Sequence, residues 1–239
     1  MTEINNNQAT TTTSLGIEEF TQSQSHGLYW DNEIREIVFN LPQCKNDTLK
    51  YDVPCEFNKF NSSENISIKT SGNNNIDCGD IIRFYELDTL NKLTIILVRY
   101  RQIGEQKQIF EILEIDYNEK LKNILFGNIP KLMLHGYVNF IKSINTGPVS
   151  NEIKKQYKVC KQKMQKTYNM YINISPKVDS KNQRRVQCSI PRIVELLEEY
   201  PEFIISRNVE ANVRGIQITQ TIESSKRKRN KTINLVIMD

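Results

Sequence analysis

Apolar residues recur along the chain in short runs with the period of a β-strand, separated by longer stretches with the period of a helix. The most apolar run, Leu93–Arg101, predicts a central strand, and Gln108–Ile115 predicts its partner in a hairpin. Shorter runs predict further strands at Leu49–Val53, Asn65–Thr70, Tyr171–Ser175, Arg185–Ile190, Phe203–Ser206, Gly215–Ile222 and Thr232–Met238.

Helical spacing of apolar residues is clearest in two segments. Gly27–Asn40 carries a stripe made of Trp30, Ile34, Ile37, Val38 and Leu41. Ser150–Met170 carries a stripe made of Ile153, Tyr157, Cys160, Met164 and Tyr168, with lysines on the remaining faces. Shorter helices are predicted at Cys78–Leu87, Leu132–Ile144 and Pro191–Tyr200. The order of elements predicts an α/β (α+β) fold with a central mixed sheet flanked by helices.

Two of the predicted strands bring polar side chains to one place. The run Leu49–Val53 delivers Asp52 just before a proline, and Asn65–Thr70 delivers Lys69. Side chains alternate along a strand, so Ile66 and Ile68 share one face while Ser67 and Lys69 share the other. A strand of this kind buries one side and presents chemistry on the other.

The composition is that of a globular chain. Of the 239 residues, 38% are hydrophobic and 25% are charged, and no run of 18 apolar residues predicts a membrane span. The first residues lack the basic start and apolar core of a signal peptide, so we expect an intracellular, cytoplasmic protein. With that setting, five cysteines without metal-ligand spacing are expected to be reduced thiols. The two histidines argue against a zinc site or a Ser-His triad.

Charge is distributed unevenly around a net value of +4. Residues 151–192 hold 11 Lys and Arg residues against only Glu152 and Asp179, and residues 226–231 read KRKRNK. This asymmetry indicates a polyanionic partner for the C-terminal half, although a solvated basic helix face is the alternative. We therefore divide the chain into an Asn/Gln/Thr-rich disordered tail (1–24), a core (25–145) and a basic helical and β-rich region packed on that core (146–239).

Asp52 and Lys69 together supply the minimum for phosphodiester cleavage. That reaction needs an activated water and neutralisation of developing charge, and Mg²⁺ provides both while taking only one or two carboxylates from the protein. A nearby lysine orients or deprotonates the water, or stabilises the transition state. The alternative is that neither residue is catalytic: Asp52 forms a turn at a strand end, and Lys69 is an exposed lysine on an edge strand.

The order of a helix with a glutamate, a strand with Asp-x-Pro and a strand with x-x-Lys resembles the PD-(D/E)xK nuclease superfamily. Within it, the stretch from YDVP to ENISIKTSGNNNIDCGDIIRFYE resembles small type II restriction endonucleases. The resemblance covers about Gly27–Leu87 and implies Mg²⁺-dependent cleavage of double-stranded DNA at a short site. It matches Asp52 and Lys69 to the motif aspartate and lysine, and Glu33 to a glutamate of the first core helix. Asp52 and Glu33 are then the expected metal ligands.

The chain departs from that pattern at Ser67, two residues before the lysine, where the family usually carries Asp or Glu. We keep Ser67 among the candidate site residues, with the missing carboxylate supplied from elsewhere. The candidates for this second acid are Glu64, Glu33, Asp77 and Asp80. Glu56 is a further candidate, but the Asp-x-Pro context favours Asp52 as the first acid.

One basic loop offers the side chains that read bases in the major groove. Arg and Lys favour guanine, and Asn and Gln favour adenine. Within SKNQRRVQ we expect DNA contacts from Lys181, Asn182, Gln183, Arg184 and Arg185, although an exposed hairpin tip is the alternative. Lys226 and Arg227, in KRKRNK, are expected to form a second phosphate clamp or a mobile loop. In a eukaryotic or viral setting the same run is typical of a nuclear localisation signal.

These features lead to a restriction-enzyme-like interpretation of the whole chain. We expect a Mg²⁺-dependent, sequence-specific double-stranded DNA endonuclease of a restriction-modification system, with a restriction-endonuclease-like core and a C-terminal basic β-rich lobe. A homodimer is expected by analogy, because a palindromic duplex matches a two-fold axis. The alternatives are a non-catalytic DNA- or RNA-binding protein derived from a nuclease fold, and an interaction protein whose lysines keep it in solution.

Overall fold

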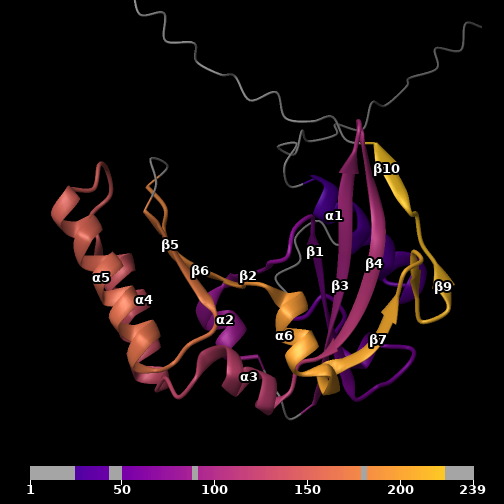
Figure 1. Ribbon diagram of the computed structural model, residues 1–239, viewed down its shortest axis with the longest axis horizontal. Helices are drawn as coiled ribbons and strands as arrows, with labels where there is room; N and C mark the ends of the chain where they lie inside the picture. The colour runs from indigo at the N-terminus through magenta and orange to yellow at the C-terminus, as the bar shows by residue number, and fades with distance from the viewer. Residues whose placement is uncertain (1–24, 43–49, 88–90, 179–181, 224–239) are drawn as a thin grey trace, which may run out of the picture.

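Two β-sheets joined by helices make up the structure, a computed structural model that describes residues 25–42, 50–87, 91–178 and 182–223 (Figure 1). The helices are α1 (Ser25–Glu33), α2 (Ile81–Tyr85), α3 (Glu119–Phe126), α4 (Lys131–Ser143), α5 (Asn151–Thr167) and α6 (Ile193–Glu199). The mixture of helices and sheets confirms the predicted α+β class. None of the described helices is both long and apolar enough to cross a bilayer.

The larger sheet contains the predicted central hairpin. Its strands are β1 (Glu64–Ser71), β3 (Lys92–Ile103), β4 (Gln106–Asp116), β7 (Ile204–Asn208) and β10 (Thr221–Glu223). The order is β1-β3-β4-β10, with β7 also paired to β4. β1 runs parallel to β3 and the remaining pairs are antiparallel, so the sheet is mixed and β1 lies at one end of it.

The smaller sheet consists of β2 (Ile76–Asp80), β5 (Asn173–Val178) and β6 (Arg184–Ile190), in the order β2-β6-β5. β6 comes from the C-terminal region and pairs with β2 of the N-terminal region, just as β7 and β10 pair with β4. The basic region that begins at residue 146 therefore completes both sheets rather than forming a lobe of its own. A small hairpin follows, made of β8 (Asn212–Val213) and β9 (Ile216–Gln217).

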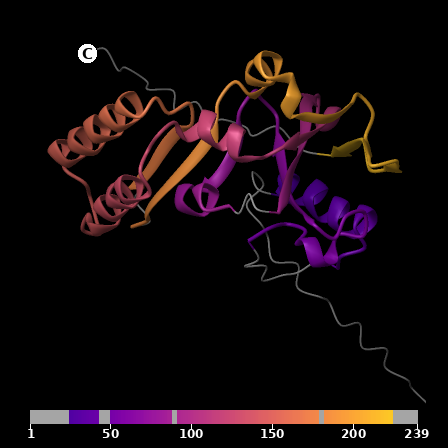
Figure 2. The ribbon, with the colours of Figure 1, turned by 90° about the horizontal axis from the view of Figure 1, so that it is seen from below.

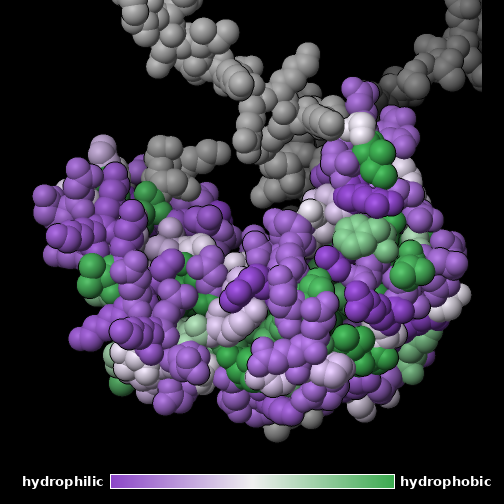
Figure 3. Space-filling model, in the orientation of Figure 1, coloured by the Kyte–Doolittle hydropathy of each residue, from purple (hydrophilic) through white to green (hydrophobic). Residues whose placement is uncertain are grey.

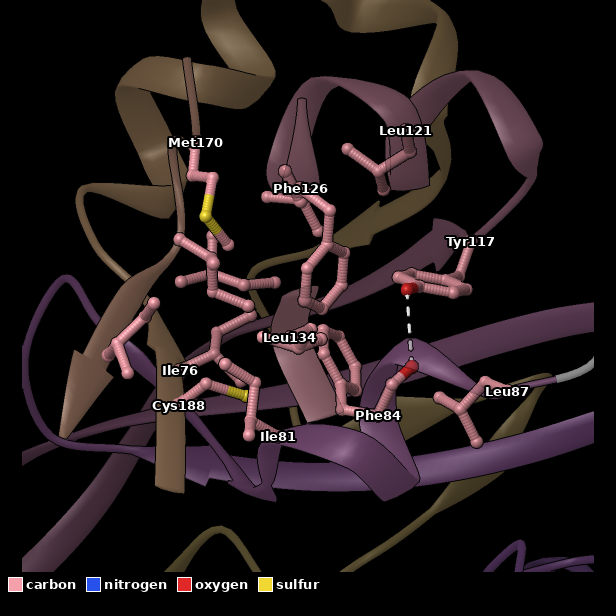
Figure 4. Packing of buried hydrophobic residues seen from close by; sticks show 14 of the residues in the cluster. Ile76, Ile81, Phe84, Leu87, Tyr117, Leu121, Phe126, Leu134, Met170 and Cys188 are labelled. Atoms are coloured by element: carbon pink, nitrogen blue, oxygen red, sulfur yellow. Dashed lines mark hydrogen bonds between the residues drawn. The ribbon is translucent and has the colours of Figure 1, made fainter. Parts of the chain in front are cut away.

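Apolar side chains gather on both faces of the larger sheet. One cluster joins α1 to the face of β1 and β3 that carries Ile66, Ile68 and Ile96. The other cluster lies on the opposite face and binds the two sheets together through side chains of β2, β6 and helices α2, α3 and α4. Figure 4 shows its centre, where Tyr117 Oη donates to the carbonyl of Phe84 at 3.5 Å. This shared cluster fixes the smaller sheet against the larger one.

The two sheets leave different elements on the two sides of the molecule. In Figure 1 the β5–β6 hairpin lies with α4 and α5 on the left, and the β3–β4 hairpin lies with α1 on the right. β1, β2, α2 and α6 lie between them, and the view from below shows the same separation (Figure 2). The segment β1–β2 therefore connects the two sides.

The first helix differs from its prediction in its last turn. Helix α1 continues into a π-helical turn at Ile34–Val38, which inserts an extra residue per turn. The apolar stripe therefore shifts: Ile37 is 46% exposed, while Arg35 is buried.

The predicted strand Leu49–Val53 is also shorter than expected. Only Val53 pairs with β1, through a bridge to Ile66, and Leu49 lies outside the described residues. The segment Cys78–Leu87, predicted as one helix, divides at Asp80 into the end of β2 and helix α2. Strand Thr232–Met238 and tail 1–24 lie outside the described residues. Helix α3 was missing from the sequence prediction.

Candidate active site

Asp52 is held at the open edge of β1 by backbone hydrogen bonds on its neighbour. Val53 N–H donates to Ile66 O at 3.1 Å, and Ile66 N–H donates to Val53 O at 2.8 Å. The chain then diverges, and the carboxylate of Asp52 takes the place of a strand partner. Its Oδ2 accepts the N–H of Ile68 at 2.6 Å. The carboxylate is thus fixed relative to β1 by the backbone itself.

The structure brings Asp52, Ser67 and Lys69 together, as the strand alternation predicts. Asp52 Oδ2 accepts a hydrogen bond from Ser67 Oγ at 3.0 Å and lies 3.5 Å from Lys69 Nζ. Lys69 Nζ also donates to the carbonyl of Ile68 at 2.9 Å. The side chains of Lys69 and Asp52 are 23% and 28% exposed, so both are reachable from solvent.

Glu33, the third expected site residue, is bound to the C-terminal segment. Its Oε1 accepts hydrogen bonds from the backbone N–H of Thr219 at 3.0 Å and from the Thr219 hydroxyl at 2.5 Å. Thr219 leads into β10, at the other end of the larger sheet from β1. Helix α1 itself packs on β1, but no hydrogen bond or ion pair of the described residues joins Glu33 to Asp52 or Lys69. Glu33 fastens the C-terminal segment to α1, and we do not assign it to the site with Asp52.

Glu64 begins β1 but is committed to a buried ion-pair network. Arg214 NH1 and NH2 donate to its two carboxylate oxygens at 2.8 and 2.9 Å, and Thr94 Oγ1 donates at 2.5 Å. Burial opposes ionisation of Glu64, but the hydrogen bonds from Arg214 and Thr94 and the charges of Arg214 and Lys92 outweigh it. The pKa of Glu64 falls to about 2. This carboxylate supports the fold and is not the second acid.

The other acids considered for that role are also placed. Asp80 caps α2, because its Oδ1 accepts the backbone N–H groups of Ile82 and Arg83, both at 3.0 Å. Glu56 lies on an exposed 3-10 turn and contacts the Cys55 thiol. Asp77 lines a polar cavity beside the end of β1. Among the described residues no group of three or more Asp, Glu, His or Cys side chains converges as a metal centre.

A cavity of about 280 Å³ opens immediately past Lys69. Thr70 and Ser71, the next two residues of β1, line it together with Tyr100 of β3. On the opposite side it is lined by polar residues of the smaller sheet: Asp77, Ser175, Lys177, Gln187 and Ser189. The cavity thus joins the strand that carries Lys69 to the basic half of the chain.

Close packing shapes the turn at the floor of this cavity. A Cβ added to Gly72 would lie 2.8 Å from Cε2 of the Tyr100 ring, so a larger residue there forces the ring to move. Tyr100 packs on Trp30 with ring centroids 5.3 Å apart. Asn74 in the same turn accepts the backbone N–H groups of Ile193, on its carbonyl, and Val194, on its side chain, both at 3.0 Å. The turn at residues 72–75 therefore connects β1 to β2 and holds the start of α6 through Asn74.

The predicted DNA-contacting loop divides into residues with different roles. Arg184 is engaged by the protein: its guanidinium donates to the carbonyls of Ile144 at 3.1 Å, Asn145 at 2.5 Å, Gly147 at 3.0 Å and Gln183 at 3.0 Å. This use of four of five N–H donors argues against a base-reading role.

The other residues predicted to contact DNA differ in how they are placed. Asn182 Oδ1 accepts the N–H of Gly147 at 2.7 Å, and Gln183 also has an interaction partner. Arg185 is exposed on the other face of β6. Lys181, Lys226 and Arg227 lie outside the described residues.

Helix α5 carries six lysines. It buries Tyr157 and Met164 and exposes Cys160, which the stripe placed inside. Lys161 Nζ donates to the carbonyl of Ile174 at 2.9 Å and so covers the open edge of β5. The exposed lysines are Lys154, Lys155, Lys158, Lys163 and Lys166. The surface over α4 and α5 is correspondingly hydrophilic (Figure 3).

The oxygen atoms around Lys69 suit a hard divalent cation. Asp52 Oδ2 and the carbonyl of Ile68 converge on the Lys69 ammonium, which shows that this point already stabilises positive charge. The hydrogen bonds of Asp52 to described residues all fall on Oδ2, so Oδ1 is open to a ligand. Mg²⁺ binds through one or two carboxylates and fills its other positions with water and phosphate oxygens. A Mg²⁺ ion at this point would therefore have Asp52 as its carboxylate.

Comparisons with known proteins leave the function to be argued from this geometry. No protein-family model matches the chain, and searches of curated proteins and of solved structures gave no match.

Proposed function

We propose that the protein is a Mg²⁺-dependent endonuclease that hydrolyses phosphodiester bonds of double-stranded DNA. Asp52 and Lys69 are its proposed active-site residues. The observation that carries the proposal is the contact of a partly exposed Lys69 ammonium with a carboxylate that the backbone of β1 holds in place. Lys69 directly precedes Thr70, which lines a polar cavity that extends to the basic half of the chain. This combination is what hydrolysis of a polyanion requires.

Each side chain has a separable part in the reaction. Asp52 would hold Mg²⁺ through its open Oδ1, and the ion when bound supplies charge neutralisation and an acidified water. Ser67 and the N–H of Ile68 keep the carboxylate oriented. Lys69 directs its ammonium toward the reacting phosphate and stabilises the negative charge that develops on it. The lysines of α5 contribute sequence-independent attraction for the phosphate backbone.

A non-catalytic DNA-binding protein is the second candidate. It is favoured by Ser67, which stands where the resembled nucleases carry an acid. The lack of a group of three metal-binding side chains in the described parts of the chain favours it as well. In that case Asp52 and Lys69 form a structural ion pair at the strand edge, and the basic surface alone acts on nucleic acid.

The test is cleavage of a mixed-sequence duplex DNA with Mg²⁺ or with EDTA, read on a gel. We expect discrete fragments in Mg²⁺ alone, and no fragments from the Asp52→Ala and Lys69→Ala variants. Circular dichroism and Tm establish that these variants are folded. Lys131→Ala serves as the control, because Lys131 is exposed and pairs with Glu86 outside the candidate site.

Two results would contradict the proposal. Normal cleavage by either Asp52→Ala or Lys69→Ala would remove the assigned site. DNA that stays intact but shifts in a native gel would favour the binding protein.

A further inference from the structure

The β5–β6 hairpin has two chemically different faces. Cross-strand pairs place Lys177 opposite Arg185 and Ser175 opposite Gln187. Side chains alternate, so these four residues lie on one face of the hairpin. The opposite face carries apolar side chains of the buried cluster, among them Cys188, which is labelled in Figure 4. The hydrophobic face is therefore used in folding, and the polar face is left for another purpose.

This polar face borders the cavity that begins past Lys69. Lys177, Gln187 and Ser175 line it from the hairpin, and Thr70 and Ser71 line it from β1. Arg185 is exposed and continues the same face beyond it. The hairpin face and the end of the candidate catalytic strand are thus two walls of one polar space.

The side chains on this face differ from Arg184 in being uncommitted. Lys177, Arg185 and Gln187 have no hydrogen bond or ion pair from their side chains to another residue in the parts of the chain that the structure describes. Arg184, one position along the strand, points to the other face and is saturated by carbonyl groups. The hairpin therefore uses one arginine to hold itself on α4 and leaves the next one available.

We propose that the polar face of β5–β6 reads base edges in the major groove of duplex DNA, which rests on the proposed nuclease function. The major groove admits a two-stranded β-ribbon. Gln187 has the donor and acceptor that pair with adenine N7 and N6. Arg185 and Lys177 have donors for guanine O6 and N7. The hydrogen-bonding match to base edges, together with positive charge, selects DNA as the occupant of this face.

The chain itself links this reading face to the reaction site. β1 passes through the turn at residues 72–75 into β2, and β2 pairs directly with β6. Asp77 of β2 lies opposite Ser189 of β6, and both line the cavity. A four-residue turn thus separates the strand of Lys69 from the sheet that contains Gln187. This short connection sets a fixed offset between the bases read and the bond cleaved.

Gln187→Ala is the decisive variant because it changes hydrogen bonding without changing charge. Wild type and variant are given a random duplex library with Mg²⁺, and the ends of the fragments are sequenced. We expect wild type to cut at one defined sequence. Gln187→Ala should lose about 5- to 150-fold discrimination at one base pair of that sequence, with an unchanged salt dependence. Lys131→Ala should keep the wild-type preference, although it removes a charge.

Arg185→Ala and Lys177→Ala provide an independent check at other base pairs, since each is expected to relax a different position. Equal Tm values for wild type and Gln187→Ala establish that the hairpin is intact. If wild type cuts at a defined sequence and all three variants retain its full preference, the proposal that β5–β6 reads bases is wrong. The proposed nuclease function would not be affected by that result. If wild type neither cuts nor binds duplex DNA, both proposals fall.

Discussion

Ser67 is the residue beside Asp52 that would set the metal affinity of the proposed site. Ser67 Oγ lies 3.0 Å from Asp52 Oδ2, so a carboxylate at this position would lie next to the first one. Two adjacent carboxylates repel each other in the absence of a cation and attract a divalent one. At the proposed metal site, a serine in this position would therefore give a lower Mg²⁺ affinity than an aspartate, without repulsion between two carboxylates.

Ser67→Asp tests this interpretation without any need for catalysis. In EDTA we expect a lower Tm than wild type by a few degrees, because the two carboxylates repel. Millimolar Mg²⁺ should restore the Tm of Ser67→Asp and raise that of wild type much less. Ser67→Asn is the matched control, since it has a similar shape to the aspartate but no charge. A Tm of Ser67→Asp that ignores Mg²⁺ would argue against a cation at Asp52.

Glu64 shows a carboxylate whose ionisation supports folding. Its pKa is about 2 in the folded protein against an ordinary value of 4.5. Its stabilisation is therefore fully present above pH 4.5 and is lost as the pH falls from 4.5 toward 2. The depressed pKa corresponds to about 3 kcal/mol.

Glu64→Gln should accordingly lower the free energy of unfolding by about 3 kcal/mol at pH 7, because it leaves buried Arg214 short of a partner. Between pH 5 and 3 the variant should lose less further stability than wild type. Urea unfolding at several pH values measures both effects. Glu202→Gln, at an exposed ion pair with Lys120, should follow the wild-type curve. Parallel curves for Glu64→Gln and wild type would refute the assignment.

At the scale of elements, the β5–β6 hairpin depends on Arg184 for its attachment to the end of α4. Four charge-assisted hydrogen bonds join its guanidinium to backbone carbonyls. Arg184→Ala should therefore cost about 2–3 kcal/mol of stability. Arg185→Ala, the adjacent exposed position, should cost less than about 0.5 kcal/mol. Chemical denaturation of both variants makes the comparison, and equal losses would show that Arg184 is not an anchor.

Some contacts of the candidate site could be predicted from the sequence, and others, such as those of Arg184, could not. Alternation along β1 was enough to predict that Ser67 and Lys69 share a face, and the resembled motif placed Asp52 beside them. The partner of Arg184 is a carbonyl 40 residues away, and no local pattern indicates it. The contact of Glu33 with Thr219 was missed for the same reason, since the two residues are 186 positions apart. The role proposed for Gln187 rests on the cavity between the two sheets, which no local pattern in the sequence indicates.

At the scale of the whole molecule, the lysines of α5 form a basic surface that is separate from the candidate site at Asp52 and Lys69. Helix α5 lies on the same side as the β5–β6 hairpin, away from the β3–β4 side (Figure 1). Its exposed lysines have a single acidic companion on that helix, Glu152. We therefore expect α5 to contact phosphates along a duplex that reaches the site.

Replacing Lys154, Lys158 and Lys163 by Gln together should weaken DNA binding equally for all sequences. The slope of log K against log salt should become shallower by about 3, because each lysine that no longer neutralises a phosphate lowers it by about one. Binding titrations at several salt concentrations provide the measurement, with Lys69→Ala as the background to prevent cleavage. An unchanged slope would place the duplex away from α5.

The ion pairs of Arg214 with Glu64 and Glu114 have a consequence for the order in which the larger sheet becomes stable during synthesis. Glu64 and its ion-pair partner Arg214 are separated by 150 residues, and β10 follows later still. When Asp52 and Lys69 have already left the ribosome, Glu64 and Glu114 still lack the counter-ion that Arg214 supplies. The sheet beneath the site reaches its full stability only after the segment with Arg214 has been made. If the protein cleaves DNA as proposed, a fully stable catalytic strand would therefore exist only after that late stage of synthesis.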